Sequence, residues 1–204
     1  MTNLIDRRGL LAGALAMASG PTLAASDTAL VRVGLKTTKG VITIDLNVGK
    51  APITARNFLR YVDVKRFDRA SFYRAAHAEG APEIGLLQGG LRGDPTKVFK
   101  PIAHESTAKT GLTHKDGAVS MACRAPGTAT ADFFICVGDQ QSLDADPAAT
   151  PPRPGFAVFG QVVDGMDVVR LIHDLPTSKT AGGAAMHGEM LSPPVTIMTA
   201  RRVA

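Results

Sequence analysis

The chain has 204 residues, of which 45% are hydrophobic, enough to form one globular domain with a core of ordinary size. Its formal net charge is +5, but the basic residues are scattered and form no block that would follow a phosphate backbone, which argues against a nucleic-acid partner. The two cysteines, Cys123 and Cys136, cannot build a disulfide framework and have no metal-ligand spacing, so we expect two buried free thiols, no metal and no other cofactor.

The first 25 residues have the form of an export signal. Arg7 and Arg8 precede a run of small and apolar residues, 9–18, and a region with A-x-A character ends near Ala25. The adjacent arginines resemble a twin-arginine signal, which directs export to the bacterial periplasm. The alternative, a membrane anchor, is disfavoured because the run is short and rich in Ala and Gly. We therefore predict a mature domain over 26–204 with no stable membrane span.

Two apolar runs in the middle of the chain, 118–122 and 133–136, bracket a polar loop with Pro and Gly. This pattern predicts two strands joined by a loop. Asp132 and Phe134 are two residues apart, so they are expected to share one strand face. A carboxylate beside a large aromatic side chain suits the lining of a pocket better than a core.

The remaining pattern predicts many short strands and two helices. Apolar residues with helical spacing follow Pro52, which suits a first helical turn, and a second helical stripe occupies 165–175. Strands are predicted at 29–35, 41–46, 70–75, 84–87, 118–122, 133–136, 156–163 and 194–203, with the first helix over 51–66. The tally indicates an all-β dominated fold, a closed eight-stranded antiparallel barrel with two helices.

Four stretches without periodicity are predicted to be loops. They are a polar segment at 76–83, a long excursion at 91–116, a proline-rich insertion at 143–155, and a Gly- and Ala-rich stretch at 177–190.

Five ordered motifs resemble the cyclophilin family of peptidyl-prolyl isomerases. They are FYR at 72–74, LLQGG at 86–90, SMA at 120–122, FFIC at 133–136 and FAVFGQVVDGMDVV at 156–169. The resemblance covers about residues 30–203. It implies an eight-stranded antiparallel barrel capped by two helices, with an active groove on the outer surface of the barrel.

The implied reaction is rotation about an X–Pro bond, which has a barrier of about 18–20 kcal/mol because the amide is conjugated. A cation that donates a hydrogen bond to the imide nitrogen stabilises the twisted state without a covalent step. Arginine suits this task because it stays charged and has fixed donors. By the resemblance this role falls on Arg74; without it, a strand arginine in a surface ion pair would be favoured.

The resemblance also implies a substrate groove. Phe134 would form the floor of a proline pocket, with Leu86 and Leu143 as its walls, and Gln88 would bind the substrate backbone. The segment Ala122–Cys123 would lie along the residue before proline. For Phe134 and Leu86 the alternative is ordinary core packing.

Several groove positions depart from the family pattern. Gly85 stands where an aromatic residue is usual, Asp132 where Gln is usual, Ser142 where Trp is usual, and Phe156 where His is usual; Cys123 and Arg124 replace Asn and Ala. The change at Ser142 implies weak binding of cyclosporin, whereas Phe156 refills some of the lost apolar volume as a groove residue.

Asp132 is the departure with the largest expected effect. If its carboxylate reached Arg74, it would fix the guanidinium and either orient or neutralise it. We therefore expect reduced isomerase activity.

Three functions are compared. The first is a periplasmic peptidyl-prolyl isomerase, expected to be a monomer that acts on proline-containing peptides and on unfolded or folding proteins. The second is a cyclophilin-like module that binds proline-containing segments without catalysis. The third, a serine or cysteine hydrolase, finds little support because Ser120 and Cys123 lack a nearby histidine in sequence and no nucleophile elbow is present. The five histidines are expected to be exposed.

Overall fold

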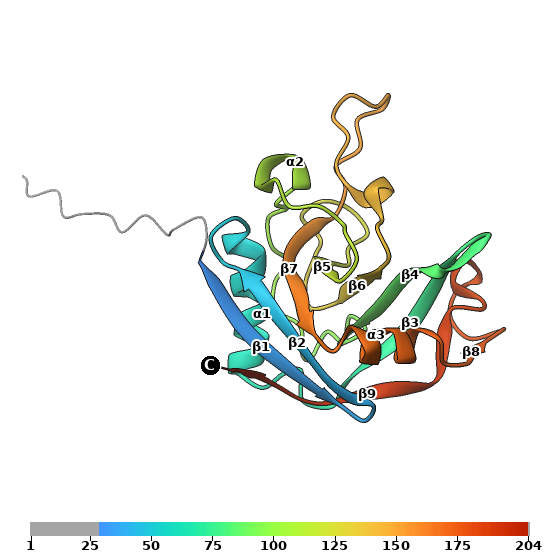
Figure 1. The fold of residues 1–204 in the computed structure, drawn as a ribbon. Helices are drawn as coiled ribbons and strands as arrows, with labels where there is room; N and C mark the ends of the chain where they lie inside the picture. Colours follow the sequence, from blue (N-terminus) through green and yellow to red (C-terminus); the bar gives the residue numbers. More distant parts are fainter. Residues whose placement is uncertain (1–28, 204) are drawn as a thin grey trace, which may run out of the picture.

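The computed structural model describes residues 29–203, and Figure 1 shows their fold. The predicted export signal, residues 1–25, lies outside these described residues. In this part of the chain no helix is both long and apolar enough to cross a membrane.

Nine strands and three α-helices make up the fold. The strands are β1 (Leu30–Thr37), β2 (Gly40–Asn47), β3 (Ala70–Ala78), β4 (Ala81–Gly90), β5 (Ala118–Met121), β6 (Phe133–Val137), β7 (Ala157–Asp164), β8 (Thr177–Ser178) and β9 (Met190–Arg202). The helices are α1 (Pro52–Asp63), α2 (Thr107–Thr110) and α3 (Met166–His173), with short 3-10 turns η1 (Gln141–Leu143) and η2 (Ala184–Met186). The four-residue α2 was not predicted.

Eight of the strands close into a barrel. They follow one another in the order β1-β2-β7-β5-β6-β4-β3-β9, every pairing is antiparallel, and β1 also pairs with β9. The two-residue β8 adds to β9 outside this ring. Closure leaves each of the eight barrel strands with a neighbouring strand on both sides. The predicted closed eight-stranded antiparallel barrel is therefore confirmed.

The strands alternate between two apolar clusters. Side chains that point inward join the main core, which includes Phe133, Ile135 and Val137 of β6. Those that point outward from the same strand, Phe134 and Cys136, join a smaller cluster on the outer surface of the barrel. Because successive residues of a strand face opposite sides, a strand buried on both faces can be apolar at every position, as β6 is.

Two helices pack on the barrel. Helix α1 contacts β2, β7 and β9, and α3 contacts β2, β3, β4 and β6 (Figure 1). Phe58 of α1 inserts into the core with its ring centroid 5.2 Å from that of Phe133 and 5.3 Å from that of Phe159. Helix α1 ends at Asp63, slightly before the predicted end near Arg66.

The N-terminus of α1 is capped from a distant part of the chain. Its N-cap residue, Ala51, offers no side-chain acceptor. The carboxylate of Glu105, which is 4% exposed, instead accepts hydrogen bonds from the backbone of Ile53 at 3.2 Å and of Thr54 at 2.8 Å, and from the Thr54 hydroxyl at 2.6 Å. A negative charge at this helix end satisfies free N–H groups and complements the helix dipole. The 91–116 excursion is thereby tied to the helix.

Two loop predictions are wrong. Segment 76–83 forms the end of β3, the start of β4 and the tight turn between them, where Gly80 adopts a φ of +76°. Its polar residues face solvent at the tip of the hairpin, which hides the strand period in the sequence. In the 177–190 segment β8 pairs with β9, and β9 begins at Met190 rather than Pro194.

Replacing Glu105 with Gln tests the capping contact. Glutamine keeps the size of the side chain but loses the charge that three donors share, so we expect the free energy of unfolding to fall by about 1–2 kcal/mol. Urea denaturation measures the change. Glu83→Gln, at an exposed position of β4, is the control and should change stability little. Equal stability of the two variants would contradict the capping role.

Candidate active site

The predicted catalytic residue Arg74 and the predicted substrate-binding residues Gln88 and Phe134 form a row across the outer face of the barrel. Strand register places Arg74 of β3 opposite Gln88 of β4, Gln88 opposite Phe134 of β6, and Phe134 opposite Ser120 of β5. Directly paired residues of antiparallel strands point to the same side of a sheet. Residues that are far apart in the sequence therefore share one surface.

Arg74 is held by two side chains. Its Nε donates to Glu189 Oε2 at 2.7 Å, and its Nη1 donates to Gln88 Oε1 at 2.8 Å. Gln88 in turn donates from Nε2 to the Tyr73 hydroxyl at 2.7 Å. The side chains of Arg74 and Glu189 are 22% and 27% exposed, so the ion pair sits at the surface of the groove and solvent screens part of its interaction.

Tyr73 reaches Gln88 because β3 is irregular at this point. The register with both β4 and β9 shifts between Phe72 and Arg74. Such a bulge turns neighbouring side chains out of strict alternation, and it lets Tyr73 and Arg74 both contact Gln88. Burial raises the pKa of Tyr73 far above its ordinary value, so the phenol stays protonated.

Asp132 does not act on Arg74 as hypothesised. Its carboxylate accepts a hydrogen bond from the backbone N–H of Arg92 at 2.8 Å, with further backbone hydrogen bonds from Leu91 and Gly93. Burial raises the pKa of Asp132 while these bonds oppose the rise. Asp132 also lies one residue before β6 rather than within it. Its role is to hold the turn after β4, and the carboxylate beside Arg74 belongs to Glu189.

The sequence-predicted pocket residues do come together. Phe134 is 3% exposed and belongs to the outer apolar cluster, against which Leu86, Ala122, Leu143 and Phe156 pack while partly buried. The rings of Phe134 and Phe156 meet edge to face with centroids 5.5 Å apart. The Cys123 side chain packs against the inner core instead, and only its backbone continues along the groove from Ala122. Cys123 and Cys136 are both free thiols, but only Cys136 is buried as predicted, because Cys123 is partly exposed.

Gly85, which replaces an aromatic residue of the family pattern, is explained by close packing. A Cβ at this position would overlap the carbonyl oxygen of Ala76 and lie 2.7 Å from Nε2 of His173. That imidazole nitrogen is 3.0 Å from the same Ala76 oxygen, in a hydrogen bond. A side chain at position 85 is therefore incompatible with the His173 contact.

Two histidines contradict the prediction of exposure, because His114 and His173 are each 1% exposed. His114 lies 3.0 Å from Ser120 through Nε2 and 2.6 Å from Asp144 through Nδ1. This contact could not be predicted from the sequence because His114 belongs to a stretch without periodicity, which gives no signal of burial. Ser120 is fully buried, so its hydroxyl cannot meet a substrate, and the hydrolase hypothesis gains no support.

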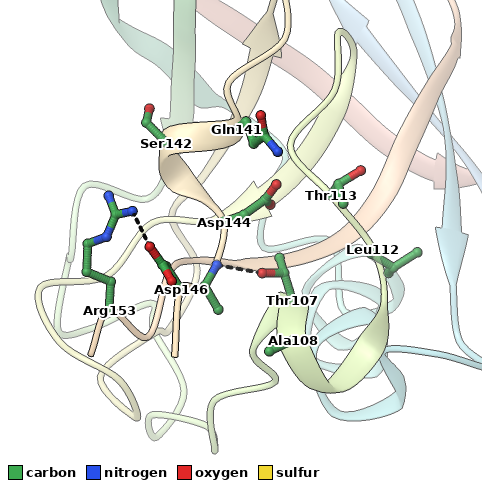
Figure 2. A pocket seen from close by; sticks show the side chains of 10 residues that line it. Thr107, Ala108, Leu112, Thr113, Gln141, Ser142, Asp144, Asp146 and Arg153 are labelled. Carbon is green, nitrogen blue, oxygen red and sulfur yellow. Dashed lines mark hydrogen bonds and ion pairs between the residues drawn. The ribbon is translucent and has the colours of Figure 1, made fainter. Parts of the chain in front are cut away.

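A cavity of about 560 Å³ opens beside the pocket wall (Figure 2). It lies between α2 and the 141–146 segment, where the Ala145 N–H donates to Thr107 Oγ1 at 2.7 Å. Ser142 lines it, at the position where the family pattern has Trp. Arg153 pairs with Asp146 at 2.9 Å across the base of the proline-rich insertion, which extends away from the barrel (Figure 1).

Within residues 29–203 no group of three or more His, Cys, Asp or Glu side chains could hold a metal ion.

Comparisons with known proteins agree with this geometry. A family model described as "Cyclophilin type peptidyl-prolyl cis-trans isomerase/CLD" matches residues 32–202. The chain is 34% identical over 181 residues to a peptidyl-prolyl cis-trans isomerase of Acinetobacter baylyi, covering 88% of this chain and 89% of that protein. It is 35% identical over 159 residues to peptidyl-prolyl cis-trans isomerase B of Escherichia coli, covering 78% and 91%.

A solved structure shares the fold. The crystal structure of a cyclophilin type peptidyl-prolyl cis-trans isomerase of Cryptosporidium parvum has a TM-score of 0.64 and 18% identity, covering 86% of this chain and 99% of that one. Together with the family match over the whole barrel, these similarities identify the chain as a member of the cyclophilin family of peptidyl-prolyl cis-trans isomerases.

Proposed function

We propose that Arg74 catalyses rotation about the X–Pro bond while the proline ring rests on Phe134. The observation that carries this proposal is the register that places Arg74, Gln88 and Phe134 side by side on three neighbouring strands. A proline ring over Phe134 would have its imide nitrogen turned toward the row of polar side chains. The substrates would be proline-containing peptides and unfolded or folding proteins.

The proposed chemistry needs no covalent step. As the X–Pro bond twists, the imide nitrogen loses conjugation and develops a lone pair, which a guanidinium N–H can bind. Arg74 stays charged under all ordinary conditions. Its bonds to Gln88 and Glu189 fix the plane of the guanidinium, so little ordering remains to be done when substrate arrives.

Glu189 would set the strength of this donor. Its carboxylate orients the arginine through Nε. The negative charge also pushes electron density toward the other guanidinium nitrogens, which weakens the positive potential that Arg74 presents to a substrate. Both groups are partly exposed, so solvent limits the second effect. On this basis we propose that the isomerase is active, but less active than one whose catalytic arginine has no carboxylate partner.

The alternative is a module that binds proline-containing segments without catalysis. The altered groove positions and the proline-rich insertion motivate it, and the Cryptosporidium parvum protein has also been solved in the presence of the dipeptide Ala-Pro. Such a module would retain the Phe134 pocket and saturate with peptide, but it would not accelerate rotation.

We also propose that residues 1–25 direct the protein to the bacterial periplasm. The support is the sequence alone: adjacent Arg7 and Arg8, the small-residue run after them, and the A-x-A character near Ala25. A folding assistant in that compartment would meet newly exported chains with slow X–Pro bonds.

Arg74→Ala separates catalysis from binding. We expect kcat/KM in a protease-coupled proline-peptide assay to fall at least about tenfold, because the transition state loses its charged donor. Peptide affinity measured by titration should change much less. Arg32→Ala removes another strand arginine with a carboxylate partner and serves as the control. A wild type that binds peptide but matches the Arg74→Ala rate would establish the binding module instead.

Glu189→Gln tests the electrostatic effect of the partner. Glutamine can still accept a hydrogen bond from Arg74 Nε but carries no charge, so we expect kcat/KM to rise about two- to fivefold as the guanidinium becomes a stronger donor. Glu189→Ala, which also removes the orienting bond, should be less active than the Gln variant. If Gln and Ala variants lose activity equally, the carboxylate assists catalysis rather than restraining it.

The export signal is tested by expressing the full chain in a bacterial host with a twin-arginine pathway. We expect periplasmic protein whose mass corresponds to cleavage near Ala25, because the receptor reads the paired arginines. Changing Arg7 and Arg8 together to Lys should keep the charge but leave uncleaved protein in the cytoplasm. Cleaved periplasmic protein from the double Lys variant would contradict a twin-arginine route.

A further inference from the structure

Three polar side chains beside the proposed proline pocket are joined by hydrogen bonds: His114 and Ser120 are buried, and Asp144 is partly exposed. His114 Nδ1 is 2.6 Å from Asp144 Oδ1, which also accepts the His114 backbone N–H at 3.0 Å, and His114 Nε2 is 3.0 Å from Ser120 Oγ. A carboxylate accepts only, so Nδ1 carries the proton and donates it to Asp144. Nε2 of the neutral ring then accepts the Ser120 hydroxyl. Every polar atom of the imidazole is satisfied.

This order of groups resembles a hydrolase triad, but its burial excludes that use. The side chain of His114 and the whole of Ser120 are inaccessible to solvent. A nucleophilic hydroxyl must meet its substrate, and Ser120 lies on β5 beneath the 112–114 segment and opposite Phe134. The hydrogen bonds of these three side chains go to one another and to the backbone of His114. Their effect must pass through what they contact.

The imidazole contacts the floor of the pocket directly. The rings of His114 and Phe134 are stacked, with centroids 5.8 Å apart and an angle of 11° between their planes. Phe156 meets both rings edge to face, at 6.4 Å from His114 and 5.5 Å from Phe134. One side of the Phe134 ring therefore rests on the imidazole.

The same histidine also holds the wall. Asp144 directly follows Leu143, and both hydrogen bonds of its carboxylate go to His114, so the position of Leu143 depends on that contact. The Leu143 carbonyl accepts the Phe156 N–H at 3.0 Å, and the His114 carbonyl accepts the Gln140 N–H at 2.7 Å. Figure 2 shows the Asp144 side chain at the edge of the neighbouring cavity, where it extends from the 141–146 segment toward Thr113.

We propose that His114 is a positioning residue of the proline pocket, which keeps Phe134 and Leu143 in the arrangement that accepts a proline ring. The inference rests on the pocket proposed above. His114 touches no substrate; it acts through the aromatic floor on one side and through Asp144 on the other. Loss of the ring would leave the pocket in several arrangements, of which only a fraction would bind peptide.

The protonation of His114 gives this role a pH dependence. Burial lowers the pKa of His114 below its ordinary value of 6.5, although Asp144 opposes the shift. The other titratable group on the facing strand, Cys136, has its pKa raised to about 12 by burial and remains a thiol. Asp116 and Asp139 lie further out, where each accepts a backbone N–H, from Gly138 and Asp116 respectively.

The direction of the pH dependence follows from these contacts. Above the pKa of His114 the neutral ring accepts the Ser120 hydroxyl. Below it Nε2 becomes a donor, the hydroxyl proton must turn away, and a charge is buried behind Phe134. Since the folded state disfavours this proton, the stabilisation is complete above pH 6.5 and is lost as pH falls through the lowered pKa. Peptide affinity should weaken over the same interval.

The test is a titration of the protein with a short peptide that contains one Ala–Pro bond, monitored by NMR. For His114→Asn, whose amide can still reach Asp144 but has no ring to stack on Phe134, we expect the peptide Kd to weaken about five- to tenfold with kcat nearly unchanged. Its Kd should also lose the pH dependence seen in wild type. Ile197→Val, which removes one methyl group from the inner core, controls for a general loss of stability.

Two further measurements separate the possible failures. Phe134→Ala should abolish peptide binding; if it does not, the pocket assignment is wrong. If Phe134→Ala weakens binding while His114→Asn binds as wild type does, only the positioning role is overturned. In case the His114 variant does not fold, the imidazole nitrogen signals of wild type should show the Nδ1–H form and shift as peptide saturates, and unchanged signals would overturn the proposal.

Discussion

The structure depends on one strand that is buried on both faces. Along β6, Phe133, Ile135 and Val137 point into the barrel, whereas Phe134 and Cys136 point outward and are buried as well. An inward phenylalanine fixes the strand to the core, through contacts with Phe58 and Phe72, and its outward neighbour then has a fixed direction. The proposed floor of the pocket, Phe134, is therefore held in place by the closed barrel, because a slip of one residue would exchange the two faces of the strand.

The electrostatics of the groove arise from a different principle. Arg74 and Gln88 are brought together by local strand pairing, but the carboxylate beside Arg74 comes from Glu189, at the end of the irregular segment before β9. The backbone of that residue also accepts the Ala75 N–H at 2.8 Å, which anchors the segment next to the catalytic strand. The barrel thus carries a charge partner supplied by a segment with little regular structure, and in the proposed mechanism the donor strength of Arg74 depends on it.

Local patterns predicted most of the fold, and contacts between distant residues account for what they missed. Alternation and turn residues predicted the first hairpin, the strands around 117–136 and the closed barrel, because each of these follows from short-range periodicity. The motifs placed Arg74, Gln88 and Phe134 correctly on one surface. By contrast, Glu105 caps a helix more than fifty positions away, and Glu189 pairs with Arg74, which lies 115 positions earlier in the sequence. Polar loops give no period from which such partners could be inferred.

The groove compensates for its unusual residues by packing from behind. Gly85 has no side chain where the family pattern has an aromatic residue. The space is needed by the buried His173, whose imidazole is hydrogen-bonded to Ala76 of β3 next to β4. Ser142 exposes a cavity in place of a large ring, while Phe156 packs edge to face on Phe134 and His114 stacks beneath it. If this face binds substrate as proposed, part of its apolar area is replaced by aromatic contacts among Phe134, Phe156 and His114. Binding would then depend less on the area of the pocket than on how firmly that wall is held, since ordering it during binding costs affinity.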